Sequence, residues 1–143
     1  MAQFVVDASV VAKWVLPGEP DQENALKLKN DHVLGLVELH APAFIVEEVA
    51  NALWRATKLK RLSQEDAQEA LIALKDMKII LYELDWAAAA QSLAVACKHN
   101  IALYDASYLF LTGKIKAQLV TADNKLYETA KDHFKLLNLK EYK

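Results

Sequence analysis

Short apolar runs that end on an aspartate and then continue into a predicted helix recur along this chain. Three such runs occur, at residues 4–6, 101–104 and 118–122, and the acids that follow them are Asp7, Asp105 and Asp123. A continuous apolar run bounded in this way is typical of a strand that is buried on both faces, as in a parallel sheet. The pattern therefore predicts an α/β fold in which several strands carry an acid at their carboxyl end.

The rest of the chain continues the alternation of strands and helices. Further strands are expected at 34–41, 79–84 and 136–139. Helices are expected at 8–16, 21–33, 43–58, from Ser63 onward, at 86–99, at 106–112 and up to Lys131. Because strands alternate with helices, the sheet should be parallel with helices on both faces. With 143 residues, we expect residues 1–143 to form a single domain with a proper core, a single-domain α/β/α sandwich around a short central parallel sheet.

Composition narrows the classes of function. Apolar residues make up 54% of the chain and charged residues 25%, as in soluble globular proteins. No apolar run reaches the roughly 18 residues that a membrane span needs, and no signal peptide precedes the first strand, so we expect a cytoplasmic protein without membrane contact. The one cysteine, Cys97, cannot form an internal disulfide and is expected to be buried. With a net charge of −2, nucleic-acid binding would need a local cationic patch.

The three aspartates are expected to lie at one edge of the sheet, because the carboxyl ends of parallel strands meet there. Each has a plain alternative role as a helix N-cap. Together they would concentrate negative charge, since two carboxylates about 4 Å apart repel by roughly 4 kcal/mol at an effective dielectric constant of about 20. Such a cluster requires protonation or a cation. Oxygen ligands in this number suit Mg²⁺ or Mn²⁺ rather than zinc.

The predicted helix 43–58 offers a fourth acid. Its apolar stripe, which should face the sheet, comprises Ile45, Val49, Ala52 and Ala56. With about 100° between successive residues, Glu48 lies about 60° from Ile45 and Glu47 about 160° away. Glu48 can therefore reach the cleft, with Asn51 and Arg55 on its side of the helix, while Glu47 faces solvent or a partner. The alternative for Glu48 is an ordinary solvated helix acid.

Four segments, taken in order, resemble those of the PIN-domain nucleases, and within them the VapC-type toxins of toxin–antitoxin pairs. These segments are residues 5–9, 48–53, 104–108 and 119–123. The resemblance implies an α/β/α sandwich, an acidic pocket that binds Mg²⁺ or Mn²⁺, and cleavage of RNA. It also implies a homodimer and a small antitoxin that docks over the pocket.

Matched position by position, the resemblance assigns the catalytic and metal-binding roles to Asp7, Glu48, Asp105 and Asp123. It places hydroxyls near the metal at Ser9 and Thr121. Some relatives carry a further acid just after the last one, where this chain has Asn124 and Lys125. In the resulting hypothesis a metal-activated water attacks the phosphodiester, and no protein nucleophile is needed. Ser9, Thr121 and Asn51 would orient the carboxylates and the water.

An acidic pocket repels RNA, so neighbouring cations must hold the phosphate backbone. The candidates are Arg55, Lys58, Lys60 and Arg61, near the end of helix 43–58, and Lys13 on the first helix. The plain alternative is a solvated helix end, where cations suit the helix dipole. For self-association, the candidate apolar surface comprises Trp14, Trp54, Val46 and Ala50, although such side chains are also typical of a core.

Other classes of protein share parts of this pattern. A phosphoacceptor receiver domain requires paired acids after the first strand, and an aspartyl phosphatase requires Asp-x-Asp there, whereas this chain has Asp7 followed by Ser9. A non-catalytic PIN-like assembly module and a PIN nuclease with an RNA-processing role remain alternatives. The histidines lack the spacing of metal ligands and are expected at the surface or in loops; they are His32, His40, His99 and His133.

Overall fold

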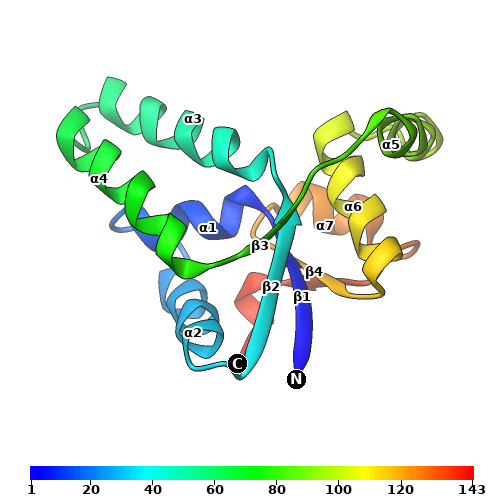
Figure 1. The fold of residues 1–143 in the computed structure, drawn as a ribbon, viewed down its shortest axis with the longest axis horizontal. Coiled ribbons are helices and arrows are strands. Elements are labelled where there is room, and N and C mark those ends of the chain that lie inside the picture. The colour runs from blue at the N-terminus through cyan, green and yellow to red at the C-terminus, as the bar shows by residue number, and fades with distance from the viewer.

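Five parallel strands form the centre of the computed structural model, which describes residues 1–143 (Figure 1). In spatial order they are β3 (Ile80–Tyr82), β2 (Val37–Pro42), β1 (Ala2–Val6), β4 (Gln118–Thr121) and β5 (Leu136–Asn138). The helices are α1 (Ala8–Val15), α2 (Gln22–Val33), α3 (Ile45–Lys58), α4 (Gln64–Leu74), α5 (Trp86–His99), α6 (Leu103–Ile115) and α7 (Asn124–Ala130), with two short 3₁₀ helices, η1 (Lys75–Met77) and η2 (Leu139–Glu141). None of these helices has the length and hydrophobicity to cross a lipid bilayer. The predicted α/β fold with a short parallel sheet is confirmed.

The chain winds outward from β1 in both directions. Helices α1 to α4 lie on one side of the sheet while the chain passes from β1 to β2 and β3, and α5 to α7 lie on the other side as it returns to β4 and β5 (Figure 1). Strands β1 and β4 are neighbours, with Val6 paired to Val120. Because the helices that follow them leave to opposite faces, the sheet opens a crevice at this point. Asp7 and Asp123 follow these two strands and lie at this crevice.

Continuous apolar strands anchor this edge of the sheet in the core. Val5, Val6, Leu119 and Val120 are completely buried. Burying an aliphatic side chain of this size contributes roughly 1.5–3 kcal/mol, so the strand ends that precede the acids are held firmly.

Helix α3 packs against the core with the apolar face that its periodicity predicts, with one residue changed. Its buried residues are Ile45, Val49, Leu53 and Ala56, so Leu53 takes the place expected for Ala52. Glu48 lies half-buried at the edge of this stripe and Glu47 is exposed, as the helical angles predict.

The prediction of a strand at residues 101–104 is wrong, because the structure has no strand there. After α5, Asn100 adopts a left-handed backbone conformation with φ of 53°, and α6 begins at Leu103. The two helices form a hairpin that leaves no residues for a strand. Leu103 and Tyr104 are 43% and 59% exposed, so the run that looked like a buried strand is a helix start at the surface. Asp105 therefore reaches the crevice from the first turn of α6.

Three side chains lie elsewhere than expected. Cys97 is exposed, because it is on the outward side of α5. His40 is buried on β2, with its Nε2 atom 2.8 Å from the Glu38 carboxylate. Trp14 is also buried, and its indole N–H donates to the carbonyl oxygen of Ala25 at 2.9 Å. Trp14 therefore belongs to the core and not to the surface proposed for self-association.

Candidate active site

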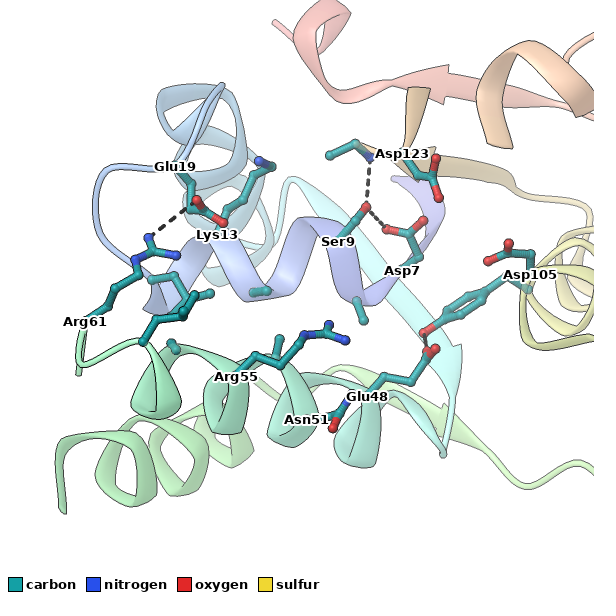
Figure 2. A pocket seen from close by; sticks show the side chains of 18 residues that line it. Asp7, Ser9, Lys13, Glu19, Glu48, Asn51, Arg55, Arg61, Asp105 and Asp123 are labelled. Atoms are coloured by element: carbon teal, nitrogen blue, oxygen red, sulfur yellow. Dashed lines mark hydrogen bonds and ion pairs between the residues drawn. The ribbon is translucent and has the colours of Figure 1, made fainter. Parts of the chain in front are cut away.

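A pocket lies where β1 and β4 end, with α1, α3 and α6 forming its walls (Figure 2). The acids predicted from the sequence all line it; they are Asp7, Glu48, Asp105 and Asp123. Figure 2 shows these acids at one end of the pocket and Lys13, Glu19 and Arg61 at the other. The pocket thus has an acidic end and an end that carries cations.

Asp7 is the buried member of the four, with 6% of its surface exposed. It caps α1 by accepting the backbone N–H of Val10 at 3.4 Å, and its two oxygens accept hydrogen bonds of 2.5 Å from the hydroxyls of Ser9 and Thr121. Burial raises the pKa of Asp7 to about 6; the hydrogen bonds oppose this rise and the charge of Asp105 adds to it. Asp7 is therefore a helix cap, and it is also a buried carboxylate whose ionised form lowers the stability of the folded state.

Ser9 and Thr121 join the ends of β1 and β4 around Asp7. Each hydroxyl donates its one proton to a different oxygen of Asp7. Each also accepts a backbone N–H at 3.0 Å, Ser9 from Ala122 and Thr121 from Asp123. Asp123 in turn caps α7. These contacts hold the two strand ends and their acids in one geometry.

Glu48 enters the pocket from α3 and meets Tyr108 of α6. The Tyr108 hydroxyl donates to Oε1 of Glu48 at 2.6 Å. Burial and the nearby charge of Glu48 raise the pKa of Tyr108, so the phenol remains a hydrogen-bond donor. Burial also raises the pKa of Glu48, against the effect of the tyrosine bond and together with the charge of Asp105. Sequence reasoning missed this role of Tyr108, because an aromatic residue on a helix looks like core and Glu48 is 60 positions away.

Asp105 is the acid without a hydrogen-bonding partner in the chain. Burial raises the pKa of Asp105, and the charge of Asp123 adds to the rise. Asp105 has the same effect on the pKa values of Asp7 and Glu48. No lysine, arginine or histidine forms an ion pair with any of the four acids, since the ion pairs of the chain all lie elsewhere. The acidic end therefore carries negative charge that the chain itself does not balance.

The opposite end of the pocket carries cations. Arg61 pairs with Glu19 at 3.6 Å and donates to the carbonyl oxygen of Pro17 at 3.1 Å, which ties it to the loop after α1. Lys13 lies at this end, and the Arg55 side chain extends from α3 toward the acids (Figure 2). The sequence pattern did not single out Glu19, because a loop acid between two helices carries no periodic signal.

The other residues predicted for the site are divided between the pocket and its surroundings. Asn51 lines the pocket on the same helix as Glu48. Lys58 stands outside it, with Nζ 4.5 Å from the centre of the Trp54 ring. Lys60 lines a separate hollow at the turn between α3 and α4. Contact of these lysines with RNA stays a prediction.

The donor chemistry of the acidic end suits a hard divalent cation. The pocket offers carboxylate and hydroxyl oxygens but no thiol and no imidazole. No three of the histidine, cysteine, aspartate and glutamate side chains stand close enough to enclose an ion by themselves. Mg²⁺ commonly binds through one or two carboxylates and keeps several waters, so wider spacing of the acids is compatible with such an ion. The residues that could hold it are Asp7, Glu48, Asp105 and Asp123.

Comparison with known proteins identifies the family. The sequence model of the PIN domain matches residues 4–132. This chain belongs to the PIN domain family. Ribonuclease VapC3 of Pyrobaculum aerophilum is 31% identical to this PIN domain over 127 residues, which cover 88% of this chain and 93% of the relative. The predicted resemblance to PIN domains with VapC-type relatives is confirmed.

Solved structures share the fold of this PIN domain. The crystal structure of Mycobacterium tuberculosis VapC20, a Sarcin-Ricin loop cleaving toxin, superposes with a TM-score of 0.70 at 14% identity, covering 92% of this chain and 95% of that one. VapBC2 from Rickettsia felis, bound to a DNA fragment from their promoter, gives a TM-score of 0.68 at 11% identity, covering 95% and 98%. At these identities the likeness establishes the architecture.

Proposed function

We propose that this PIN domain is a VapC-type ribonuclease, that is, a Mg²⁺- or Mn²⁺-dependent endoribonuclease and the toxin of a toxin–antitoxin pair. The observation that carries the proposal is the meeting of Asp7, Glu48, Asp105 and Asp123 at one end of a pocket that also presents cations. Burial raises the pKa of three of these acids, and none has a counter-ion within the chain. A divalent cation would balance this charge. The ribonuclease name of the relative supports RNA as the substrate.

In this mechanism the four acids hold the metal. When bound, a divalent cation activates a water molecule and stabilises charge on the leaving oxygen of a phosphodiester. Ser9 and Thr121 keep the Asp7 carboxylate from rotating by occupying both of its oxygens. A side-chain nucleophile is not required, since the Ser9 proton is donated to Asp7 and no histidine lines the pocket to act as its base.

The cations of the pocket would bind the RNA backbone. Lys13 and Arg55 form no ion pair within the chain, whereas Arg61 is engaged with Glu19. Lys13 and Arg55 are therefore available for phosphate oxygens, and Lys58 and Lys60 would extend the contact beyond the pocket. Binding of this kind weakens as salt is added, because the release of counterions from RNA, which favours binding, gains less entropy in a more concentrated salt solution.

Cleavage of single-stranded RNA in the presence of Mn²⁺ tests the proposal. We expect Asp7→Asn to abolish cleavage while the protein stays folded. Asp85→Asn is the matched control, because Asp85 is also an N-cap, accepting the N–H of Ala88 at 2.8 Å, but lies outside the pocket at the start of α5. Equal activity of Asp7→Asn and the wild type would contradict the metal mechanism.

Thermal melting with and without Mn²⁺ tests the cation site separately from cleavage. A ligand that binds only the folded state stabilises it by about 2.7 kcal/mol at 100 times its Kd. We expect the Tm of the wild type to rise in millimolar Mn²⁺ and that of Asp7→Asn to change little. An unchanged wild-type Tm would favour the alternative of a non-catalytic assembly module.

The toxin role implies a small antitoxin that docks over the pocket, in the cytoplasm where the RNA substrate lies. The alternative is a PIN nuclease with an RNA-processing role, which would cleave RNA without such a partner. Adding the product of the neighbouring reading frame to the cleavage assay distinguishes the two. Inhibition supports a toxin pair, and unchanged cleavage supports RNA processing.

The homodimer expected for such a protein has a suitable surface on α5. Residues 86–97 contain no charged side chain, and Trp86 and Leu93 are 93% and 55% exposed. Exposed aromatic residues and depletion of charge are typical of interface centres. In a two-fold pair through α5, this uncharged surface of one copy would face the same surface of the other. We expect Trp86→Ser to convert a dimer to a monomer in analytical ultracentrifugation; a monomeric wild type would contradict the dimer.

A further inference from the structure

Tyr108 reaches the acidic end of the pocket with its hydroxyl while its ring is fixed in the core. The residue is 2% exposed and belongs to the pocket lining. Its ring stands edge-on to Phe44, with ring centroids 5.4 Å apart and an angle of 82° between the planes. Phe44 precedes α3, and Tyr108 follows Asp105 by three positions on α6, so Tyr108 and Asp105 share one side of that helix. The phenol therefore lies where two helices each bring one acid to the pocket.

Glu48 has few other restraints on its position. The bond from Tyr108 is the hydrogen bond that its carboxylate receives within the chain. Ordering a glutamate side chain costs up to about 2 kcal/mol of rotamer entropy, and the charge of Asp105 repels it. Without the hydroxyl, both effects favour rotation of Glu48 toward solvent. Asp7 differs, because two other hydroxyls hold it independently of Tyr108.

We infer that Tyr108 is a positioning residue that holds Glu48 in the pocket and thereby sets the affinity of the acidic end for a divalent cation. The inference rests on the proposed function, since it takes Glu48 to be a metal ligand. The bond occupies Oε1 of Glu48 and leaves Oε2 without a partner in the chain, so one oxygen is free for an ion. Residues that orient metal ligands in this way typically contribute about 10–100-fold in affinity.

Titration of Tyr108→Phe with Mn²⁺, followed by electron paramagnetic resonance of the free ion, tests this inference. We expect binding about tenfold weaker than in the wild type. In RNA cleavage, kcat should fall at low Mn²⁺ and recover at saturating Mn²⁺, while KM for RNA stays unchanged.

Tyr142→Phe is the matched control. The Tyr142 hydroxyl also donates to a carboxylate, Asp31, at 2.6 Å, but outside the pocket. This variant should lower the Tm and leave Mn²⁺ affinity as in the wild type, whereas a merely structural role of Tyr108 would make the two variants behave alike.

Glu48→Asp keeps the test decisive if Tyr108→Phe does not fold. The shorter acid withdraws its carboxylate from the intact Tyr108 hydroxyl, so we expect a similar loss of Mn²⁺ affinity. Wild-type affinity in Glu48→Asp would overturn the inference. In a Glu48→Gln background, adding Tyr108→Phe should cause no further loss, because the two residues act through the same carboxylate.

The failure of this inference can be told from the failure of the proposed function. A wild-type protein that binds no Mn²⁺ overturns the proposed metal site and the inference with it. A wild-type protein that binds Mn²⁺, with Glu48→Gln weakened and Tyr108→Phe unchanged, overturns the role of Tyr108 alone.

Discussion

Two buried tyrosines donate to carboxylates in different parts of the molecule, and the surroundings of the two pairs differ. Tyr108 donates to Glu48 and Tyr142 to Asp31, both at 2.6 Å. The second pair joins the C-terminal segment to α2, a helix that lies near the labelled C-terminus in Figure 1. The pKa of Asp31 is lowered, because Lys27 and then Tyr142 donate hydrogen bonds to it. The pKa of Glu48 is raised, because burial and the charge of Asp105 outweigh the tyrosine bond.

The difference between the pairs is a cation supplied by the chain. Lys27 lies 2.6 Å from Asp31, which completes that pair with a phenol and an ammonium group. Asn24 further ties the C-terminal segment to α2 by donating to the carbonyl oxygens of Lys140 and Tyr142. No lysine or arginine pairs with Glu48. The same tyrosine–carboxylate chemistry thus stabilises the fold in the pair with Asp31 and, in our proposal, prepares a cation site in the pair with Glu48.

Neutralising the acid of each pair should produce the largest difference between the two pairs, and the difference should be in RNA cleavage. We expect Glu48→Gln to lower RNA cleavage by about 10²–10³-fold, since it removes a carboxylate that would hold the cation, and the cation is what would stabilise negative charge at the reacting phosphate. Asp31→Asn should cleave as the wild type does. Glu47→Gln, one residue away on the exposed side of α3, is the control for helix effects. Loss of cleavage in Glu47→Gln alone would overturn the assignment of Glu48 to the pocket.

The unbalanced charge at the pocket should also appear as a pH dependence of stability. The pKa of Asp7 is about 6, against an ordinary value of 3.8, so the folded state binds this proton more tightly than the unfolded chain does. Wild-type stability should therefore fall as the pH rises from about 4 to about 6. In metal-free buffer, Asp7→Asn should become more stable than the wild type by up to about 3 kcal/mol at pH 7. Urea unfolding of the wild type and of Asp7→Asn at pH 4 and pH 7 measures this difference in stability. A difference that shrinks as the pH rises would contradict the prediction.

Asp31 should show the opposite sign. Its pKa is lowered, so its contribution to stability is complete above the ordinary pKa of an aspartate and is lost as the pH falls through the folded value. We expect Asp31→Asn to lose about 1–2 kcal/mol at pH 7 and less at pH 3, where protonation of the unfolded chain has begun to compete. Thermal melts at the two pH values provide the measurement, and equal losses at both would refute the assignment of this effect to charge.

Removing the cation of the second pair should have the smallest effect. Lys27 is half-exposed, so Lys27→Gln should cost about 0.5 kcal/mol and less in high salt. Lys27→Gln should also raise the pKa of Asp31 toward its ordinary value, and NMR titration measures this pKa directly. If that pKa stays low in the variant, the cation does not explain the difference between the two pairs.

Several parts of the site could be predicted because their signals are local. Asp7 and Asp123 follow buried strands and cap the next helix, and both lie at the crevice. The position of Glu48 follows from the angles of a single helix. The position of Asp105 was predicted for the wrong reason, because four residues of apolar sequence do not distinguish a buried strand from a helix start at the surface.

Other parts escaped prediction because their signal lies in another segment. Nothing near Tyr108 marks it as a partner of Glu48, and nothing near Trp14 indicates that Ala25 will accept its indole proton. Cys97 is exposed although its neighbours are alanines, because one side of α5 packs against α6 and the other side does not.

The sequence by itself determined the order of the helices and of five strands, the parallel sheet and three of the four acids at its edge, because periodicity and capping act over a few neighbouring residues. Only the tertiary structure decided which hydroxyl meets which carboxylate. Thr121 and Asp7 are 114 positions apart, and Tyr142 and Asp31 are 111 apart. Contacts across such separations depend on how whole helices and strands pack, and packing sums many weak interactions that no local pattern records.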